Sequence, residues 1–467
     1  MRGRRGLPGA FPGERRPRTS RTGAAGFATA ERRPEARGAH ASLTGRMVGG
    51  TVVMKFGGTS VADAERIQNA ARRIVRQREA GNRVVAVLSA RGKTTDELIA
   101  MAREVSPQPD PREMDMLLST GERMSCALCA MAINDLGHRA ISLTGSQAGI
   151  VTDTSHTRAR IVDVRARRIE EALEDDSIVL VAGFQGVSTD YDVTTLGRGG
   201  SDTTAVALAA AIGADVCEIY TDVAGVFSAD PRIVPDARKI PVVSFEEMLE
   251  MASSGAKVLQ LRSVEYARNH GVRIHCRSSF GDGPGTVVVG EDQTMEHPLI
   301  TAVTHSSEEA RVTLLGVPDR PGVAGRIFGA LADADVNVDM IIQNEPESEG
   351  HGADLSFTVA REDLRDARAT LDPLVAELGI GGVAEDQEMG KVSIVGAGMR
   401  SHPGVAATVF RTLGDERINI EMISTSPIKI SCVIRSAQVP DAVRALHGAF
   451  ELGEGAVAHE RPFADPR

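Results

Sequence analysis

The sequence predicts an α/β protein: a three-layer αβα domain on a largely parallel sheet, followed by two ferredoxin-like domains of the βαββαβ type. Two observations lead to this fold class. From residue 51 to about residue 290, apolar runs rich in β-branched residues alternate with helical runs. Strands that are apolar along their whole length are typical of a parallel sheet covered by helices on both faces. The second half of the chain repeats one pattern after about 80 residues, which indicates a duplicated supersecondary unit.

In the first half, strands and helices are expected to alternate in order. The expected strands are Thr51–Met54, Arg83–Ala90, Ala140–Thr144, Ser177–Phe184, Val216–Thr221 and 272–277. The expected helices follow Asp63, begin near Thr95, or cover 113–135, Arg160–Leu173, Ser201–Ile212, 244–251 and 256–270. Ligands of such folds bind at the carboxyl ends of the strands. The residues at or just after those ends are Lys55, Ser89, Phe184 and Thr221.

The stretch from Met54 to Val61 (MKFGGTSV) is a candidate anion-binding turn. Lys55 ends a strand, glycines and hydroxyl residues make the turn, and Asp63 can cap the helix that follows. Such a turn presents backbone N–H groups to an anion, and glycine lets phosphate oxygens come close. The chain contains no GxxxxGK[ST] sequence, so this is not a Walker loop. Taken alone, the two glycines also fit an ordinary strand-to-helix turn.

Each copy of the repeat reads strand, Pro-Gly turn, helix and strand, with a further strand and helix behind. The matching segments are 312–316, Arg320–Ala324 and Val336–Met340 in one copy, and 392–396, His402–Ala406 and Ile418–Met422 in the other. The further elements are expected at Ala353–Val359, 362–378, Ile428–Ile434 and 440–450. This order is ferredoxin-like. Two copies fit a module that binds a small ligand or pairs with another subunit, and they also fit a duplicated domain without a ligand.

Composition argues against several classes of protein. The net charge of −10 argues against nucleic acid or an anionic membrane as the main partner. No apolar run approaches the ~20 residues of a transmembrane helix. Five scattered cysteines suit a reducing compartment, so we expect a cytoplasmic protein. Cys126 and Cys129 form a C-x-x-C without a second pair, so we expect buried residues and no metal site.

Residues 1–46 form a separate leader. This segment is rich in Arg, Gly, Pro and Ala and contains no lysine, so it cannot bury a core and we expect it to be disordered. An Arg-rich leader with few acidic residues can be an organelle transit peptide. A start codon assigned too far upstream explains it equally well, and Met47 or Met54 is then the true start. The remaining boundaries are expected to give domains at 47–294, 295–385 and 386–467.

Three further motifs, together with the Lys55 turn and the repeat, resemble the aspartate kinases, which belong to the amino-acid kinase superfamily and end in two regulatory ACT domains. The motifs are Met114–Arg123 (MDMLLSTGER), Thr195–Thr204 (TLGRGGSDTT) and Tyr220–Arg232 (YTDVAGVFSADPR). The resemblance extends from about residue 50 to 460. It implies transfer of the γ-phosphoryl group of ATP to the β-carboxylate of L-aspartate, which gives 4-phospho-L-aspartate on the route to lysine, threonine and methionine. The nucleophile is already ionised at pH 7, so the chemistry needs positive charge and alignment, not a general base.

The resemblance also implies roles for individual residues. Lys55 is the candidate for bridging the phosphates in the transition state, Asp202 for holding a lysine in place, and Ser201 for a position beside it at a helix N-terminus. The nucleotide is expected at Lys55, Gly57, Gly58, Ser89, Thr221, Asp222, Phe227, Arg232 and Lys257. Magnesium should be held mainly by the phosphates and water, so no protein ligand is named.

Aspartate needs recognition at both ends. Arg198 can clamp a carboxylate with two parallel hydrogen bonds, and Glu122 can pair with the α-ammonium group. By resemblance, the pocket is completed by Thr95, Gly199, Gly200 and Ser201.

The paired ACT domains imply feedback by lysine and/or threonine, bound between ACT units of paired subunits. The expected effector residues are Asp319, Pro321, Gly322, Ala324, Asn337, Val338, Asp339, Gln343, Val405, Ala406, Asn419 and Ile420. Ala406 replaces the threonine of many relatives, and Pro427 stands where they often have an acid. The identity of the effector, and sensitivity itself, therefore stay open. Arg91 also replaces a commoner methionine near the nucleotide.

Two alternatives stay open. A kinase of the same fold could act on acetylglutamate, glutamate, carbamate or uridylate, although Glu122 with Arg198 argues against it. An amino-acid sensor with an inactive kinase domain is the second alternative, but Lys55, Asp202 and Lys257 are all present.

By resemblance, the assembly should be a homo-oligomer or an α2β2 complex with an ACT subunit started internally at Met295. A copy that serves a specialised pathway fits equally well.

Overall fold

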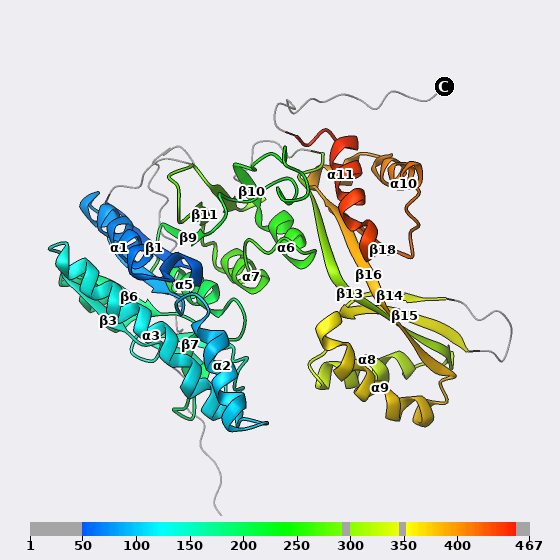
Figure 1. The fold of residues 1–467 in the computed structure, drawn as a ribbon, viewed down its shortest axis with the longest axis horizontal. Coiled ribbons are helices and arrows are strands. Elements are labelled where there is room, and N and C mark those ends of the chain that lie inside the picture. Colours follow the sequence, from blue (N-terminus) through cyan, green and yellow to red (C-terminus); the bar gives the residue numbers. More distant parts are fainter. Residues whose placement is uncertain (1–48, 292–298, 345–351, 454–467) are drawn as a thin grey trace, which may run out of the picture. The chain divides into compact units, whose positions relative to one another are not determined.

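The computed structural model describes residues 49–291, 299–344 and 352–453 (Figure 1). The predictions for the leader at 1–46, for Met47 and for Met295 lie outside the described residues. The same holds for the expected domain boundary at 294/295.

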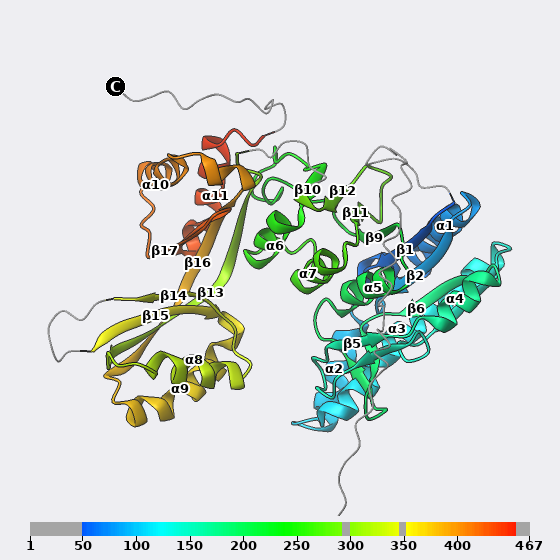
Figure 2. The same cartoon turned by 180° about the vertical axis from the view of Figure 1, so that it is seen from behind.

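An eight-stranded sheet forms the middle layer of the first domain (Figures 1 and 2). Its strands are β1 (Thr51–Phe56), β2 (Arg83–Leu88), β3 (Ala140–Leu143), β6 (Ile178–Ala182), β9 (Val216–Thr221), β10 (Val242–Ser244), β11 (Ile274–Ser278) and β12 (Thr286–Val289). They are ordered β10-β12-β11-β9-β1-β2-β6-β3, and only β11 and β12 pair antiparallel. The predicted, largely parallel sheet is confirmed.

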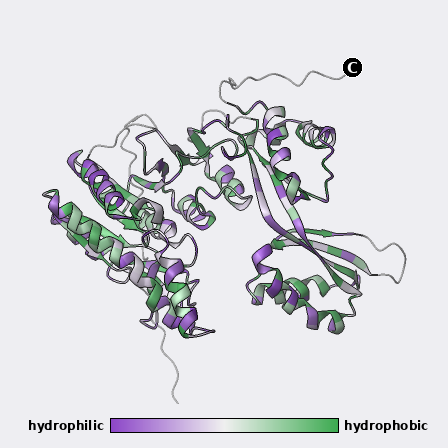
Figure 3. Cartoon of the chain, in the orientation of Figure 1, coloured by the Kyte–Doolittle hydropathy of each residue, from purple (hydrophilic) through white to green (hydrophobic). Residues whose placement is uncertain are grey.

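Helices cover both faces of this sheet. One face carries α1 (Ala64–Glu79) and α3 (Pro111–Asp135), and the other carries α4 (Arg167–Glu174), α5 (Gly200–Ala211), α6 (Phe245–Ser253) and α7 (Leu261–His270). Helix α2 (Thr94–Val105) packs against α3 and buries no residue of its own. Val52 and Met54 of β1 pack with α1 and α3, whereas Val53 packs in the core cluster formed with α4 to α7. Burial on both faces explains why the strands are apolar throughout. Figure 3 shows α1 largely in the hydrophilic colour, which fits a helix that buries a single stripe.

Local capping explains where several helices begin. The backbone N–H of Arg66 donates to the side chain of Asp63 at 2.9 Å, so the predicted cap of α1 is confirmed. Asp110 caps α3 and Pro111 occupies its first position, so this helix starts two residues earlier than expected. Cys126 and Cys129 lie on α3 and are buried free thiols, as predicted.

The segment Arg160–Leu173 was predicted wrongly as one helix. It forms β5 (Ile161–Val164) and then α4, which starts at Arg167. The strand belongs to a four-stranded sheet, ordered β5-β4-β7-β8, that the sequence did not predict. Its other strands are β4 (Ile150–Thr152), β7 (Gln185–Ser188) and β8 (Val193–Thr195). Strands of three or four residues are too short for a period to be recognised.

Helix α7 also begins later than predicted, at Leu261. The preceding residues form a loop in which Gly255 has a φ of +107°. A Cβ at this glycine would lie 1.9 Å from the carbonyl oxygen of His305, so close backbone packing as well as a left-handed conformation requires glycine.

The repeat forms one six-stranded sheet, ordered β14-β15-β13-β16-β18-β17. Its strands are β13 (Ala302–Val317), β14 (Val338–Gln343), β15 (Ala353–Ala360), β16 (Gly382–Val395), β17 (Met422–Ser426) and β18 (Lys429–Arg435). Its helices are α8 (Val323–Asp333), α9 (Leu364–Leu378), α10 (Val405–Asp415) and α11 (Val439–Ala449). The predicted order of strand, helix, strand, strand and helix is confirmed in each copy.

The two copies share their long strands, which the sequence did not predict. Residues 309–317 of β13 pair with β15 of the first copy, while the end of β16 pairs with β18 of the second. β13 and β16 pair with each other along most of their length. The expected boundary at 385/386 therefore lies inside β16. No turn signal interrupts 382–395, because the last strand of one copy continues as the first strand of the next.

Candidate active site

The strand ends that were predicted to form the site lie next to one another. β9, β1, β2 and β6 are consecutive in the sheet and parallel, so their carboxyl ends share one edge. Backbone hydrogen bonds join the residues that follow: Ser89 N–H donates to Phe56 at 3.1 Å, and Gly57 N–H donates to Tyr220 at 3.2 Å. Phe184 follows β6, and its N–H donates to the hydroxyl of Thr204 on α5. The edge is therefore a connected set of short loops.

Lys55 and Asp202 form an ion pair at this edge. The Nζ of Lys55 contacts Oδ1 of Asp202, and the two side chains are only 12% and 8% exposed. Asp202 lies in the first turn of α5, where the helix dipole stabilises a carboxylate. Ser201 precedes it in the same turn and is buried. The predicted pairing of Asp202 with a lysine is present, and the partner is Lys55.

The glycine turn after Lys55 packs tightly against the loop after β2. A Cβ at Gly58 would lie 2.8 Å from the carbonyl oxygen of Ala90, and Gly92 N–H donates to the carbonyl oxygen of Gly58 at 3.0 Å. The turn continues as a 3₁₀ helix, η1 (Gly58–Val61), in which Ser60 is buried. Close packing thus requires glycine at Gly58, independently of any phosphate.

Glu122 lies on α3 with its carboxylate buried beneath the loop after β2. Its Oε1 accepts a hydrogen bond from Ala90 N–H at 3.2 Å, and its Oε2 is buried without a hydrogen-bond partner among the described residues. Burial raises the pKa of Glu122 to about 7. A buried carboxylate oxygen without a partner is costly, which makes this atom a candidate ligand contact. Thr95 lies in the first turn of the neighbouring α2.

Arg198 lies in a glycine turn that leads into α5. Gly197 and Gly199 on either side of it have φ angles of +75° and +72°. Its side chain is 89% exposed, with Nη2 3.6 Å from Oε2 of Glu362. Gly200 begins α5 and is buried. The guanidinium group is thus presented by backbone geometry and is not enclosed.

The expected nucleotide segment is partly enclosed and partly exposed. Thr221 ends β9 and donates to Asp222 at 3.1 Å, and Phe227 is half-buried. Arg232 is 88% exposed and contacts Asp230 at 2.6 Å. Lys257, in the loop between α6 and α7, is 78% exposed and lies 2.9 Å from Glu308. Neither of these cations joins the buried pair of Lys55 and Asp202.

The two Pro-Gly turns of the repeat have matching geometry. Gly322 and Gly404 precede α8 and α10 with φ angles of +95° and +104°. The expected effector residues lie in or beside these turns, on the strand that follows, or in the residues just before that strand, namely Asp319, Pro321, Ala324, Asn337, Val338, Gln343, Val405, Ala406, Asn419 and Ile420. Asp339, on β14, forms an ion pair with the buried Lys391.

Two functional candidates escaped the sequence analysis, namely Asp115 on α3 and Arg262 on α7. Asp115 is fully buried, and both side chains contact the segment that leads to Arg198. Asp115 is seven residues before Glu122, so both face the same side of α3, and this spacing was a usable signal. No local pattern marks Arg262.

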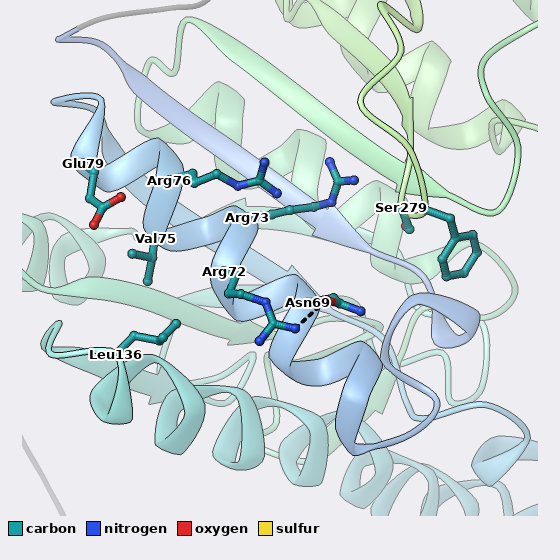
Figure 4. A pocket seen from close by; sticks show the side chains of 9 residues that line it. Asn69, Arg72, Arg73, Val75, Arg76, Glu79, Leu136 and Ser279 are labelled. Carbon is teal, nitrogen blue, oxygen red and sulfur yellow. Dashed lines mark hydrogen bonds between the residues drawn. The ribbon is translucent and has the colours of Figure 1, made fainter.

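A separate cavity of about 490 Å³ lies along the outer side of α1 (Figure 4). It is lined by Asn69, Arg72, Arg73, Val75, Arg76, Glu79, Leu136, Ser279 and Phe280. Its arginines have protein partners: Arg73 lies 3.0 Å from Asp282, and Arg72 donates to Asn69 at 2.6 Å. The cavity includes none of the predicted site residues.

Within residues 49–291, 299–344 and 352–453, no group of three or more His, Cys, Asp or Glu side chains is arranged to hold a metal ion. None of the helices in those ranges is both long and apolar enough to cross a membrane.

The chain is similar to known proteins over most of its length. Residues 50–278 match the amino acid kinase family, and residues 311–376 and 392–450 each match an ACT domain. An aspartokinase of Mycolicibacterium smegmatis is 58% identical over 405 residues, which cover 86% of this chain and 96% of the relative. An aspartokinase of Corynebacterium glutamicum is 55% identical over the same length.

The solved structures point the same way. E. coli aspartokinase III in complex with aspartate and ADP has a TM-score of 0.74 at 26% identity. The match covers 85% of this chain and 99% of that one. The same enzyme in complex with lysine and aspartate has a TM-score of 0.67 at 27% identity, over 86% of this chain and 99% of the other.

Proposed function

The chain belongs to the aspartokinases and is a kinase, and we propose that it transfers the γ-phosphoryl group of ATP to the β-carboxylate of L-aspartate. The product is 4-phospho-L-aspartate, the first intermediate toward lysine, threonine and methionine. The observation that carries the proposal is the buried ion pair of Lys55 and Asp202 at the strand edge, beside the loop that covers Glu122. The names of the relatives, and the aspartate and ADP bound by the E. coli enzyme, support this choice of substrates.

Lys55 provides the positive charge that the reaction requires. Both the attacking carboxylate and the phosphate are anionic, so a cation between them lowers the electrostatic barrier. Asp202 fixes the ammonium group of Lys55 in one place, which avoids reorganisation during the reaction. Lys257 and Arg232, which are exposed, complete the nucleotide site by contacting phosphates. The remaining nucleotide contacts come from Gly57, Gly58, Ser89, Thr221, Asp222 and Phe227.

Glu122 and Arg198 recognise aspartate at its two ends. The partnerless Oε2 of Glu122 accepts from the α-ammonium group, which shifts the carboxyl group toward its ionised form. The exposed guanidinium of Arg198 donates two parallel hydrogen bonds to a carboxylate. Thr95, Gly199, Gly200 and Ser201 complete the pocket. A free ammonium and a carboxylate are both needed, which favours aspartate over acetylglutamate.

Magnesium enters with the nucleotide as part of the substrate, held mainly by phosphate oxygens and water. It supplies charge neutralisation at the transferring phosphoryl group. The protein's own contribution is the placement of lysines around that complex.

Lysine, threonine or both act as effectors at the turns before α8 and α10. The lysine bound by the E. coli relative supports an amino acid as the ligand class. The chain works as a homo-oligomer or in an α2β2 complex, in the cytoplasm. All five cysteines are free and buried, which suits a reducing compartment.

The test is formation of an acyl phosphate, trapped as the hydroxamate, with ATP and magnesium. Aspartate, glutamate and acetylglutamate are offered separately, each with and without lysine and threonine. Hydroxamate formation from aspartate, but not from glutamate or acetylglutamate, supports the proposed substrate. Suppression of this reaction by lysine or threonine supports the proposed regulation. Turnover of another carboxylate in place of aspartate would overturn the proposal.

A further inference from the structure

Two charged side chains without an assigned role lie on either side of the segment that leads to Arg198. Asp115 on α3 is fully buried, and Arg262 in the first turn of α7 is half-buried. Both bind the same two stretches of chain, residues 156–159 and residues 195–196. We call these two stretches, with Asp115 and Arg262, the clamp.

Asp115 joins the two stretches through its carboxylate. Its Oδ1 accepts a hydrogen bond from the hydroxyl of Thr195 at 2.5 Å. Its two oxygens accept from Thr157 N–H at 3.1 and 3.0 Å, and its Oδ2 lies 2.7 Å from Nδ1 of His156. Because these groups donate hydrogen bonds to it, the carboxylate of Asp115 can be fully buried. The hydrogen bonds form only when the two stretches keep this arrangement around Asp115.

Thr157 has a left-handed backbone with a φ of 65°. This conformation is a genuine outlier for a β-branched residue, and such strain persists only where surrounding contacts enforce it. The bonds from its N–H to Asp115 supply that enforcement. A Cβ at Gly197 would lie 3.2 Å from the carbonyl oxygen of Thr157, so the strained residue packs directly against the turn that holds Arg198.

Arg262 joins the same stretches from the other side. Its Nη1 donates to the carbonyl oxygen of Leu196 at 2.9 Å, and its Nη2 donates to that of Ala159 at 2.8 Å. Between the two charged side chains, Ala159 N–H donates to the carbonyl oxygen of Thr195 at 2.9 Å. A planar guanidinium group with several donors is suited to bridge two carbonyls at once.

We propose that Asp115 and Arg262 are positioning residues for aspartate, because the clamp fixes the turn that presents Arg198. Arg198 is 89% exposed and stands between two glycines with positive φ, so its own side chain is not held by packing. Its direction is set by the backbone, and the last residues before it that Asp115 and Arg262 bind are Thr195 and Leu196. This inference rests on the proposed function, since it assigns Arg198 to the substrate carboxylate.

The test compares variants that remove one clamp contact with matched controls. Asp115→Asn removes the charge, and Thr195→Val removes the hydroxyl donor with little change in shape. Thr195→Ser keeps the hydroxyl. Glu247→Gln is the second control, because Glu247 is also a buried carboxylate that accepts several hydrogen bonds, but from Ser244, Thr301 and the Ala397 N–H. The KM for aspartate, the KM for ATP and amide hydrogen exchange of residues 195–200 are measured for each.

Both Asp115→Asn and Thr195→Val should raise the KM for aspartate about tenfold, while the KM for ATP stays within about twofold of wild type. Exchange at 195–200 should become faster in the same two variants. Thr195→Ser and Glu247→Gln should match wild type in all three measurements. If Asp115→Asn does not fold, the comparison of Thr195→Val with Thr195→Ser tests the proposal by itself.

An unchanged KM for aspartate in Asp115→Asn and Thr195→Val overturns the clamp, and so does an equal rise in both KM values. Wild-type protein that does not phosphorylate aspartate overturns the proposed function instead. In that event hydrogen exchange alone decides whether the clamp holds the turn, and unchanged exchange at 195–200 overturns it.

Discussion

The candidate site has a buried half and an exposed half. Lys55, Asp202 and Glu122 are 12%, 8% and 3% exposed, and each contacts a group of the protein itself. Arg198, Arg232 and Lys257 are 89%, 88% and 78% exposed, and their acidic neighbours are 3.6, 2.6 and 2.9 Å away. The sequence analysis named residues of both halves, and one motif, Thr195–Thr204, contains the exposed Arg198 as well as the buried Asp202.

The difference in burial predicts which residues contribute to stability as well as to function, and which contribute to function alone. A buried charge without its partner is strongly unfavourable, so substitutions in the buried half are expected to affect both stability and the proposed reaction. Exposed ion pairs contribute little, so residues of the exposed half can exchange a protein carboxylate for a substrate anion at small cost. Substitutions in the two halves should therefore have different signatures.

The largest effect is expected for Lys55→Met. It leaves Asp202 as an unpaired buried carboxylate, so we expect a loss of about 3–5 kcal/mol in the free energy of unfolding. The value of kcat should fall by about three orders of magnitude, because the transition-state charge loses its partner. Urea unfolding and steady-state kinetics measure the two effects.

The double variant Lys55→Met with Asp202→Asn sharpens this prediction. Without the unpaired charge, most of the lost stability should return, while kcat should stay as low as in Lys55→Met. Equal destabilisation of the single and double variants would contradict the assignment of the pair to the buried half.

Glu122→Gln should have the next largest effect. It cannot accept from an ammonium group as a carboxylate does, so the KM for aspartate should rise about 10- to 100-fold. In wild type, affinity for aspartate should improve as the pH rises through about 7, where Glu122 ionises. Initial rates at varied aspartate concentration between pH 5.5 and pH 8.5 test both points. If the KM for aspartate depends on pH in the same way in wild type and in Glu122→Gln, Glu122 does not bind the α-ammonium group.

The same residue predicts a pH effect on stability. The pKa of Glu122 is raised from 4.5 to about 7 by burial, so ionisation is harder in the folded than in the unfolded state. Wild type should therefore lose stability relative to Glu122→Gln as the pH rises from 4.5 to about 7, and no further above it. Melting temperatures of the two proteins across this range provide the measurement.

Arg198→Lys tests the exposed half. It keeps the charge but loses the planar pair of donors, so we expect about a tenfold rise in the KM for aspartate. The free energy of unfolding should stay within about 0.5 kcal/mol of wild type, because no buried contact is lost. A marked loss of stability would place Arg198 with the buried half.

The smallest effect is expected for Lys257→Ala. Its exposed pair with Glu308 should add at most about 1 kcal/mol to stability, so the melting temperature should hardly change. The KM for ATP should rise several-fold, and this difference should shrink at high salt. Glu308→Ala is the matched control, since it breaks the same ion pair but should leave the KM for ATP unchanged.

Strong periodicity made most of the fold predictable. The continuous apolar strands predicted the parallel sheet, and the cap at Asp63 predicted the start of a helix. The repeat predicted two related units. The four-stranded sheet was missed because strands as short as Ile150–Thr152 carry no period. The shared strands β13 and β16 were missed because their pairing is a long-range property that local sequence does not specify.

The residues of the site could be predicted only where they lie in recognisable sequence motifs. The sequence indicated Lys55, Asp202 and Glu122, but it could not separate them from exposed Arg198 and Lys257, since burial depends on tertiary packing. The clamp residues show the same limit. Asp115 lies within a motif, whereas Arg262 acts through backbone carbonyls of residues more than sixty positions away.

The most direct test of the account is acyl phosphate formation from aspartate by wild type and by the Lys55→Met, Asp202→Asn double variant, side by side. Both proteins should be folded, so the comparison isolates the chemistry. We predict ATP-dependent aspartyl hydroxamate from wild type and none above background from the double variant. Comparable hydroxamate from the folded double variant would contradict the claim that the buried pair carries phosphoryl transfer.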